Sequence, residues 1–226
     1  MAVLEVCAGT LQSVHAAAEG GAPRIELCSA LELDGLTPEW ETLRRARSLY
    51  PSLIIHVLIR PRPGDFCYGA ADSARMRSEI RTAMDLGADG IAVGCLTPEG
   101  EVDIPAMEGI MEIADNVTFH RAFDLCRDPF KALEEIIGLG CRRILTSGQE
   151  RTAFEGIGLL SALRERSAGR IIILPGSGVT PQNARVIISS TGCTEIHSSA
   201  SVMVDGRKET SAATVAAILA DIRHAG

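Results

Sequence analysis

Glutamate and cysteine occur two residues apart in two apolar segments near the start of this sequence. They are Glu5 and Cys7 in the first segment, and Glu26 and Cys28 in the second. Side chains alternate between the two faces of a strand, so each pair would lie on one face. If both faces point into the lumen of a barrel, two carboxylates and two thiols gather on neighbouring strands. Carboxylates at such a place can act as general acids or bases.

Further charged or titratable side chains end later apolar segments, and we expect them in the same space: Arg60, His120 and His197. Ionised groups cannot remain unpaired inside a barrel, so they must pair with one another or hold a ligand. Together with Glu5 and Glu26 they form a candidate catalytic set. In this set Arg60 would hold an anion, a glutamate would act as general base, and His120 would act as acid or electrophile. The alternative is a purely internal network of ion pairs that caps the core.

A glycine-containing turn follows the seventh apolar segment and consists of Gly176, Ser177 and Gly178. Glycine lets backbone N–H groups approach an anion at the start of a helix. Ser198 and Ser199 follow the eighth segment. Loops at these two places commonly bind phosphate in α/β barrels. The residues therefore predict an anion-binding site, although such a turn is often only a chain reversal.

The longest connection in the chain runs from Arg60 to Asp72. Its prolines stiffen it, and Arg62 is suited to bidentate recognition of a carboxylate or phosphate. Connections of this length in compact domains often serve as lids. We therefore include Arg62 among the candidate anion-binding residues, with a solvated surface loop as the alternative.

Eight short apolar segments must position these side chains. They begin near Val3, Arg24, Leu53, Gly90, Val117, Arg143, Arg170 and Glu195. Helical patterns lie between them, and the spacing suits one strand, one three-turn helix and two short loops. An N-cap residue followed by proline predicts a helix start at three places: Thr37, Asp128 and Thr180.

A fourfold repeat supports closure of the strands into a barrel. A glycine stands just before each even-numbered strand: Gly21, Gly87, Gly140 and Gly192. Glycine there suits the left-handed residue that ends the preceding helix. We therefore predict an α/β protein, a single parallel (β/α)8 TIM-type barrel over residues 1–226. Its working site would lie at the carboxyl ends of the strands. A doubly wound open sheet is the alternative architecture.

The composition excludes several classes of protein. Hydrophobic residues make up 46% and the net charge is −7, so the basic footprint of a nucleic-acid-binding protein is missing. No apolar run approaches the ~18 residues that span a bilayer, and the first residues do not resemble a signal peptide. The seven scattered cysteines predict free thiols in a reducing compartment. We therefore expect a cytoplasmic protein that binds neither nucleic acid nor membranes.

The segments at the strand ends resemble the CutC family of copper homeostasis proteins. They are Leu-Glu-Val-Cys (4–7), Arg-Ile-Glu-Leu-Cys-Ser-Ala (24–30), Ile-Arg-Pro-Arg (59–62), Thr-Phe-His-Arg-Ala-Phe-Asp (118–124), Arg-Ile-Leu-Thr-Ser-Gly (143–148) and Pro-Gly-Ser-Gly-Val (175–179). The resemblance covers essentially residues 2–200. It implies a cytoplasmic, often homo-oligomeric barrel that is linked to copper tolerance, and it implies Cu(I) binding by Cys7 and Cys28. The chain departs from the usual family pattern at Pro63, Cys95, Ser177 and Ser198.

Three functions are consistent with these residues, and the first two can coexist. The first is copper homeostasis through Cu(I) binding by Cys7 and Cys28. The second is an enzyme with lyase-like or isomerase-like acid–base chemistry on a small anionic or phosphorylated substrate. The third is binding of a hard or borderline divalent ion by four side chains: Glu5, Glu26, His120 and His197. We rank the third last, because a guanidinium at Arg60 would repel the cation.

Overall fold

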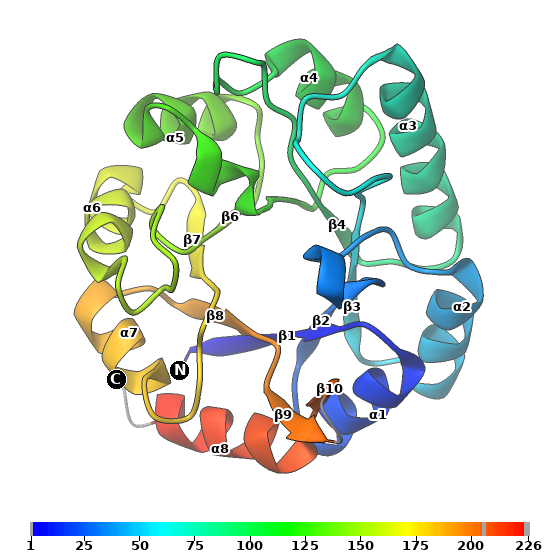
Figure 1. Ribbon diagram of the computed structural model, residues 1–226, viewed down its shortest axis with the longest axis vertical. Coiled ribbons are helices and arrows are strands. Elements are labelled where there is room, and N and C mark those ends of the chain that lie inside the picture. The colour runs from blue at the N-terminus through cyan, green and yellow to red at the C-terminus, as the bar shows by residue number, and fades with distance from the viewer. Residues whose placement is uncertain (1, 205–206, 224–226) are drawn as a thin grey trace.

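The computed structural model describes residues 2–204 and 207–223 and shows a nearly closed barrel of parallel strands (Figure 1). The strands are β1 (Val3–Ala8), β2 (Arg24–Leu27), β3 (Ile54–Leu58), β4 (Gly90–Val93), β5 (Val117–Phe119), β6 (Arg143–Thr146), β7 (Ile172–Pro175) and β8 (Glu195–Ser198). Their order is β7-β6-β5-β4-β3-β2-β1-β8, so the hydrogen-bonded sheet is open only between β7 and β8 among the described residues. The predicted TIM-type (β/α)8 fold is confirmed.

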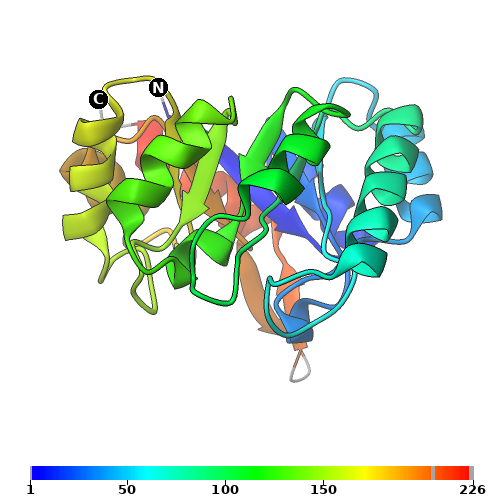
Figure 2. The same cartoon turned by 90° about the horizontal axis from the view of Figure 1, so that it is seen from above.

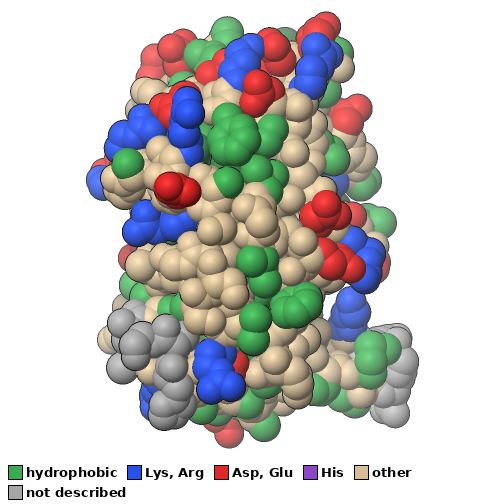
Figure 3. Space-filling view, turned by 90° about the vertical axis from the view of Figure 1, so that its left-hand side faces the viewer, with side chains coloured by type: hydrophobic (Ala, Val, Ile, Leu, Met, Phe, Trp, Pro, Cys, Tyr) green, Lys and Arg blue, Asp and Glu red, His purple; other side chains and the backbone are tan. Residues whose placement is uncertain are grey.

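Helices follow the strands and form the outer ring seen in Figure 1. They are α1 (Leu11–Glu19), α2 (Trp40–Leu49), α3 (Ala70–Asp85), α4 (Ile104–Met111), α5 (Pro129–Gly138), α6 (Ile157–Ser167), α7 (Ala184–Thr191) and α8 (Ala212–Arg223). Two 3-10 turns, η1 (Leu31–Leu33) and η2 (Arg121–Leu125), follow β2 and β5. On the outer face over α5, α6 and α7, acidic and basic side chains lie interspersed (Figure 3).

Alternation along the strands separates an aliphatic layer from a polar lumen. In β1, Leu4 and Val6 are fully buried and belong to the same core cluster as Val14 of α1. Glu5 and Cys7 point the other way, toward side chains of β2 and β8. The polar residues at every second position of the strands therefore meet inside the barrel, and the aliphatic residues between them bind the helices to it.

The turns before the even-numbered strands share one backbone conformation, in agreement with the fourfold repeat in the sequence. The four glycines before the even-numbered strands all have a positive φ of 67–89°. Residues with a Cβ are strained in that left-handed region, so glycine is the residue that ends each of these helices with least cost. The repeat thus marks where each helix stops and turns back toward the sheet.

A two-stranded antiparallel hairpin, which we did not predict, follows β8. It consists of β9 (Ser201–Val204) and β10 (Arg207–Thr210). The hairpin projects from the same end of the barrel as η1 (Figure 2). It therefore borders the mouth formed by the carboxyl ends of the strands. Among the described residues, no helix combines the length and apolarity that crossing a membrane requires.

Candidate functional site

Two adjoining cavities lie at the carboxyl ends of the strands. The first, which we call the mouth pocket, has a volume of about 350 Å³, and its lining includes Cys7, Glu26, Arg60, Phe66, His120 and His197. The second, the side pocket, has a volume of about 540 Å³, and its lining includes Ser177, Gly178, Ser198, Ser199 and Lys208. Three residues line both cavities: Cys7, Arg121 and His197. Most of the predicted site residues thus line these two cavities, and four of them do not: Glu5, Cys28, Arg62 and Gly176.

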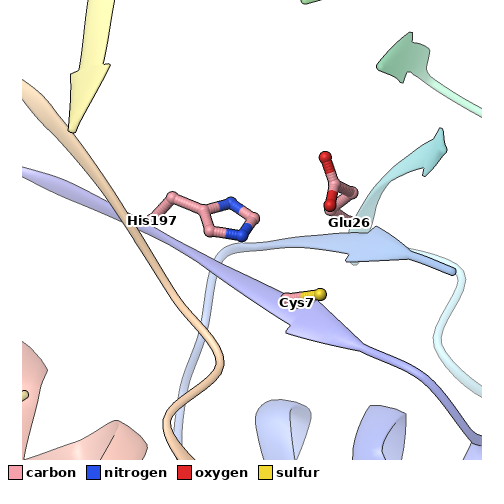
Figure 4. A group of neighbouring side chains, drawn as sticks. All are labelled: Cys7, Glu26 and His197. Atoms are coloured by element: carbon pink, nitrogen blue, oxygen red, sulfur yellow. The ribbon is translucent and has the colours of Figure 1, made fainter. Parts of the chain in front are cut away.

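Three side chains on neighbouring strands face one another at the floor of the mouth pocket. Cys7 of β1, Glu26 of β2 and His197 of β8 each contribute a potential ligand atom, and these atoms all lie within 4.8 Å of one another. Figure 4 shows the His197 ring pointing from β8 toward the thiol and the carboxylate. The arrangement offers sulfur, oxygen and nitrogen donors to a single bound group.

The two predicted thiol ligands also lie together. Cys7 Sγ is 3.5 Å from Cys28 Sγ, and the Cys28 thiol donates a long hydrogen bond of 3.6 Å to the carbonyl oxygen of Ala8. Cys7 is half-buried, whereas Cys28 is fully buried. The hydrogen bond to Cys28 and burial raise the pKa of the Cys7 thiol well above its usual value. Cys7 is therefore a protonated thiol at neutral pH unless a bound metal displaces the proton.

Glu5 contacts the His197 ring on the side away from the mouth pocket, and it lines neither pocket. Glu5 Oε1 lies 2.9 Å from His197 Nδ1, and Glu5 Oε2 accepts a 2.6 Å hydrogen bond from Arg24 Nε. His56 Nδ1 lies 3.1 Å from the same Oε2 atom. Burial opposes ionisation of Glu5, but its bonds to the two histidines and to Arg24 outweigh burial and lower its pKa. Glu5 is thus a charged residue that orients a histidine.

A network of ion pairs continues below Glu5 toward the amino ends of the strands. Arg24 forms a second ion pair with Glu195, and Arg143 Nε lies 2.8 Å from the same carboxylate. Arg143 also donates a 3.0 Å hydrogen bond to Asn116 Oδ1. We call Arg24, Glu5, Glu195 and Arg143 the lower network. The alternative of an internal ion-pair network, considered from the sequence, therefore applies to Glu5.

Glu26 differs from Glu5 because it has no cationic partner at ion-pair distance among the described residues. Glu26 is only 5% exposed, and its Oε2 atom lacks a hydrogen-bond partner within the described part of the chain. Burial raises the pKa of Glu26 to about 7, despite the opposing charge of His197. A carboxyl group with this pKa can exchange a proton at physiological pH.

His120 follows β5 and presents an uncharged imidazole to the mouth pocket. Its Nδ1 atom accepts a 3.2 Å hydrogen bond from the backbone N–H of Ala122, so Nε2 carries the proton of the neutral ring. Burial and the nearby charge of Arg60 lower the pKa of His120 to about 3. A Cβ at Gly94 would lie 2.7 Å from Nδ1, so glycine makes room for the ring. Nε2 has no hydrogen-bond partner among the described residues.

Arg60 ties together two segments beside the mouth pocket, one after β2 and one after β3. Its guanidinium donates hydrogen bonds of 2.8, 3.0 and 2.9 Å to the carbonyl oxygens of Leu33, Gly35 and Gly64. It also lies over the ring of Phe66, 5.0 Å from the centroid. The charge therefore stays beside the pocket, while most N–H groups hold the surrounding backbone in place.

Arg62 lines neither pocket. Its guanidinium bonds Asp72 and Asp65 at 2.9 Å each and lies over the ring of Tyr68, 5.1 Å from the centroid. These bonds tie the loop between β3 and α3 together, in keeping with a structural role in that loop. An anion in either pocket would not contact this side chain.

The glycine turn after β7 borders the side pocket through Ser177 and Gly178, but Gly176 does not line the pocket. A Cβ at Gly176 would lie 2.5 Å from Leu145, so this glycine allows close packing. The expectation that the turn opens a helix is wrong, because α7 begins at Ala184. Ser198 and Ser199 come from the facing end of β8 and line the same pocket.

Sequence reasoning missed His56, Arg24 and Glu195 as partners in the lumen. Arg24 and Glu195 each lie two residues before a predicted site residue, and His56 lies four residues before Arg60. An even spacing along a strand places two side chains on the same face. Lys208, which brings positive charge to the side pocket, was also missed. Alternation would have identified the strand residues, whereas Lys208 depends on the hairpin.

Comparison with known proteins assigns the family. The model of the CutC family matches residues 2–202. This chain belongs to the CutC family. A CutC family protein of Bacteroides thetaiotaomicron is 50% identical over 198 residues, which cover 87% of this chain and 80% of that protein. A CutC family protein of Bacteroides fragilis is 49% identical over 200 residues, covering 88% and 80% of the two chains.

A solved CutC structure supports the same assignment. The crystal structure from Streptococcus agalactiae, assigned as copper homeostasis protein CutC, superimposes with a TM-score of 0.84 at 30% sequence identity. The match covers 88% of this chain and 99% of that chain. The CutC resemblance inferred from the strand-end motifs is confirmed, and the barrel described above is the fold of a solved CutC family member.

Proposed function

We propose that this CutC family protein takes part in copper homeostasis by binding Cu(I) through the thiolates of Cys7 and Cys28. The observation that carries the proposal is the 3.5 Å separation of the two sulfur atoms on neighbouring strands. Soft thiolate ligands select Cu(I) over harder ions. The name of the Streptococcus agalactiae structure, which refers to copper homeostasis, supports the same function.

The surroundings of the two thiols suit the binding of a soft ion. Cys7 lines both pockets and gives an ion a route from solvent, while Cys28 is buried beside Leu58 and Ala92 in a small apolar cluster. Among the described residues, this is the pair of cysteines whose sulfur atoms are in contact. Because the pKa of Cys7 is raised, Cu(I) must displace a proton, and binding should strengthen as pH rises.

A Cu(I) titration tests this function. Anaerobic protein competes with a chromophoric Cu(I) chelator, with wild type compared with Cys7→Ser, Cys28→Ser and the control Cys67→Ser. Cys67 is also half-buried but lies in the loop after β3, outside the lining of both pockets. We expect one tightly bound Cu(I) in wild type and in the control, and a loss of at least about tenfold in affinity in each of the other variants. Equal affinity in all four proteins would rule the thiolate site out.

We propose as a second function that the mouth pocket binds a small anionic ligand and performs acid–base chemistry on it. Three buried atoms that lack hydrogen-bond partners among the described residues favour this function: Glu26 Oε2, His120 Nε2 and Arg60 Nε. Buried polar atoms are normally paired, so their partners are to be sought on a ligand. Glu26 would be the base, neutral His120 would donate a hydrogen bond, and Arg60 would supply positive charge.

The side pocket would hold the charged end of a phosphorylated ligand. Ser177, Gly178 and Ser199 line it from the two loops that bind phosphate in many barrels, and Arg121 and Lys208 add positive charge. Because the two pockets share part of their lining, one ligand could occupy both. Metal capture by the thiols and chemistry in the mouth pocket are compatible, since they use different atoms for most of their contacts.

Thermal denaturation with a panel of phosphorylated metabolites tests the second function. A ligand present at 100 times its Kd should stabilise the native protein by about 2.7 kcal/mol. We expect this stabilisation in wild type and in the control Arg62→Met, and its loss in Arg121→Met. If no phosphorylated compound stabilises wild type, the proposal of an anionic ligand fails.

We further propose that the protein acts in the cytoplasm as a homo-oligomer. Seven cysteines without a disulfide suit a reducing compartment. Large apolar side chains are exposed on β9, namely Val202, Met203 and Val204, and could be covered by another copy of the chain. Light scattering after size-exclusion chromatography checks this, because a mass of one chain at micromolar concentration would contradict it.

A further inference from the structure

His197 is held in the manner of a metal-binding histidine. Its Nδ1 atom lies 2.9 Å from Glu5 Oε1, which leaves Nε2 as the nitrogen available to another group. A ligating histidine usually donates its other ring N–H to a carboxylate or carbonyl, which fixes the ring and raises its basicity. Glu5 is itself fixed by Arg24 Nε at 2.6 Å, so the orientation of His197 is determined by a buried ion pair.

We propose that Cys7, Glu26 and His197 form a binding site for a zinc ion, with His197 as a ligand through Nε2 and Glu5 as the residue that positions it. The site goes beyond Cu(I) binding by two thiolates, because it uses a carboxylate and an imidazole and does not use Cys28. The two sites share Cys7, and the zinc site also uses Glu26, which would not act as a general base while zinc is bound. A chain would therefore bind one of the two ions at a time.

The donor set and its geometry fit zinc. Zinc accepts sulfur, nitrogen and carboxylate oxygen ligands at 2.0–2.3 Å in tetrahedral sites, which places the ligand atoms roughly 3.5 Å apart. The three donors here lie within 4.8 Å of one another, so side-chain rotations that bring them about 1 Å closer would complete the set. The side chains come from three neighbouring strands, whose hydrogen-bonded pairing keeps their backbones in place.

Glu26 gives independent evidence that the cluster of Cys7, Glu26 and His197 binds a further group. Glu26 is more than nine-tenths buried and lines the mouth pocket. Its Oε2 atom has no hydrogen-bond partner in residues 2–204 and 207–223. Burying a carboxylate is costly, and the nearby charge of His197 offsets this cost only in part. A divalent ion beside the Cys7 thiolate and Glu26 would neutralise two negative charges at once.

The sequence suggested a different divalent site, made of Glu5, Glu26, His120 and His197. Its ligand set is not assembled, because the Glu5 carboxylate is bonded to Arg24 and His120 is not part of the close group of donors. Arg60 also lines the mouth pocket and keeps its positive charge there. Its NH1 and NH2 groups are directed to the carbonyl oxygens of Leu33, Gly35 and Gly64.

The three protein ligands would leave a fourth position of the ion toward the mouth pocket, which all three of them line. Zinc sites with three protein ligands bind water or a substrate oxygen there and polarise it. The ligand class is therefore water or an oxygen donor of a small anion, near the unpartnered Nε2 of His120. This gives the neutral imidazole a hydrogen-bond acceptor.

Zinc titration of metal-free protein against a chromophoric zinc chelator tests the site. We expect one zinc ion per wild-type chain, and a loss of affinity of at least about tenfold in Glu26→Gln, in His197→Gln and in Glu5→Gln. Cys67→Ser is the matched control, because this half-buried thiol lies outside the lining of both pockets and should leave zinc affinity unchanged. Circular dichroism and Tm establish that each variant is folded before its affinity is compared.

Cobalt(II) provides a second readout that does not require the buried acidic variants to fold. Bound to wild type and to Cys28→Ser, it should show the same charge-transfer band from one cobalt–thiolate bond, and Cys7→Ser should abolish the band. A band that halves in Cys28→Ser, or zinc affinity that is equal in wild type and Glu26→Gln, would overturn the proposal. The Cu(I) titration can succeed or fail independently, since Cys28 is proposed as a ligand of Cu(I) and not of zinc.

Discussion

The lower network and the mouth pocket contain similar side chains but differ in how completely these are paired. In the lower network, Glu5 and Glu195 each bond to Arg24, and Arg143 completes the pairing of Glu195 at 2.8 Å. In the mouth pocket, Glu26 Oε2 and His120 Nε2 have no hydrogen-bond partner among the described residues. Both groups are buried, so access to solvent does not explain the difference.

Fully paired charges and unpaired titratable groups thus lie within one lumen. Paired charges at the amino ends of the strands replace an apolar filling of the barrel and hold Glu5 in a fixed position. Unpaired groups at the carboxyl ends keep their bonding capacity for a metal or a ligand. The pKa values follow the same division, because that of Glu5 is lowered while that of Glu26 is raised to about 7.

The largest effect is expected when the lower network is broken. Arg24→Met leaves two buried carboxylates without their shared cation, and removal of one partner of a buried ion pair costs about 3–5 kcal/mol. Urea denaturation at pH 7 measures the change in the free energy of unfolding. Arg60→Met is the comparison in the mouth pocket, and we expect it to cost less, because it leaves neutral carbonyl oxygens and not carboxylates without their partner. Equal losses would show that the two regions do not differ as described.

Protonation of Glu195 at low pH should weaken its ion pairs with Arg24 and Arg143 in the lower network. Burial opposes its ionisation, but Arg24 and Arg143 outweigh burial and lower its pKa. A lowered folded-state pKa adds stability above the unfolded pKa of about 4.3, and this stability is lost as pH falls through the folded-state value. Glu195→Gln should therefore cost roughly 1.5–3 kcal/mol at pH 7, and the difference from wild type should shrink below pH 4. A constant difference in urea denaturation from pH 7 to pH 3 would contradict this.

A smaller effect is expected from the corresponding change in the mouth pocket. Glu26→Gln keeps the shape of the side chain and removes a carboxylate that has no cationic partner. We expect the free energy of unfolding of metal-free protein to change by about 1 kcal/mol or less at pH 7. Urea denaturation beside Glu5→Gln, which loses bonds to Arg24 and His197, provides the comparison. A loss for Glu26→Gln as large as that for Glu5→Gln would show that Glu26 is a structural residue.

The barrel could be predicted from the sequence because its strands and turns carry local signals. All eight observed strands begin within two residues of the predicted positions. Asp128 caps α5 as predicted, accepting bonds from the N–H groups of Phe130 and Lys131 at 3.0 Å. The prediction was wrong at Thr37, because α2 begins at Trp40. Thr37 Oγ1 instead accepts a 3.0 Å hydrogen bond from the backbone N–H of Arg60.

Thr180 and the hairpin show two further limits of local signals. Thr180 lies in a turn before Asn183, and α7 begins after that residue, so the Thr-Pro pair marks a turn and not the helix start. The hairpin has a sequence signal that we did not use, the Asp-Gly pair at 205–206 after an apolar run. The position of the hairpin beside the mouth depends on the fold.

Convergence of the site residues could be predicted from alternation, but their pairing could not. Glu5 and Glu26 have the same residue type and both are followed by cysteine two residues later. Their difference arises from the stagger of β1 and β2, which places Glu5 beside Arg24 and Cys7 beside Glu26. Stagger is a property of the closed barrel as a whole, so no single segment encodes it.

The smallest expected effect is the absence of a titration at His120. Burial and the charge of Arg60 hold its pKa at about 3, so the ring should stay neutral between pH 5 and pH 8. Because the N–H of Ala122 donates to Nδ1, the proton should reside on Nε2 and point into the mouth pocket. Nitrogen-15 NMR of the imidazoles measures both properties. A pKa for His120 near 6.5 would place a cation beside Glu26, and the neutral hydrogen-bond donor that distinguishes the mouth pocket from the lower network would be lost.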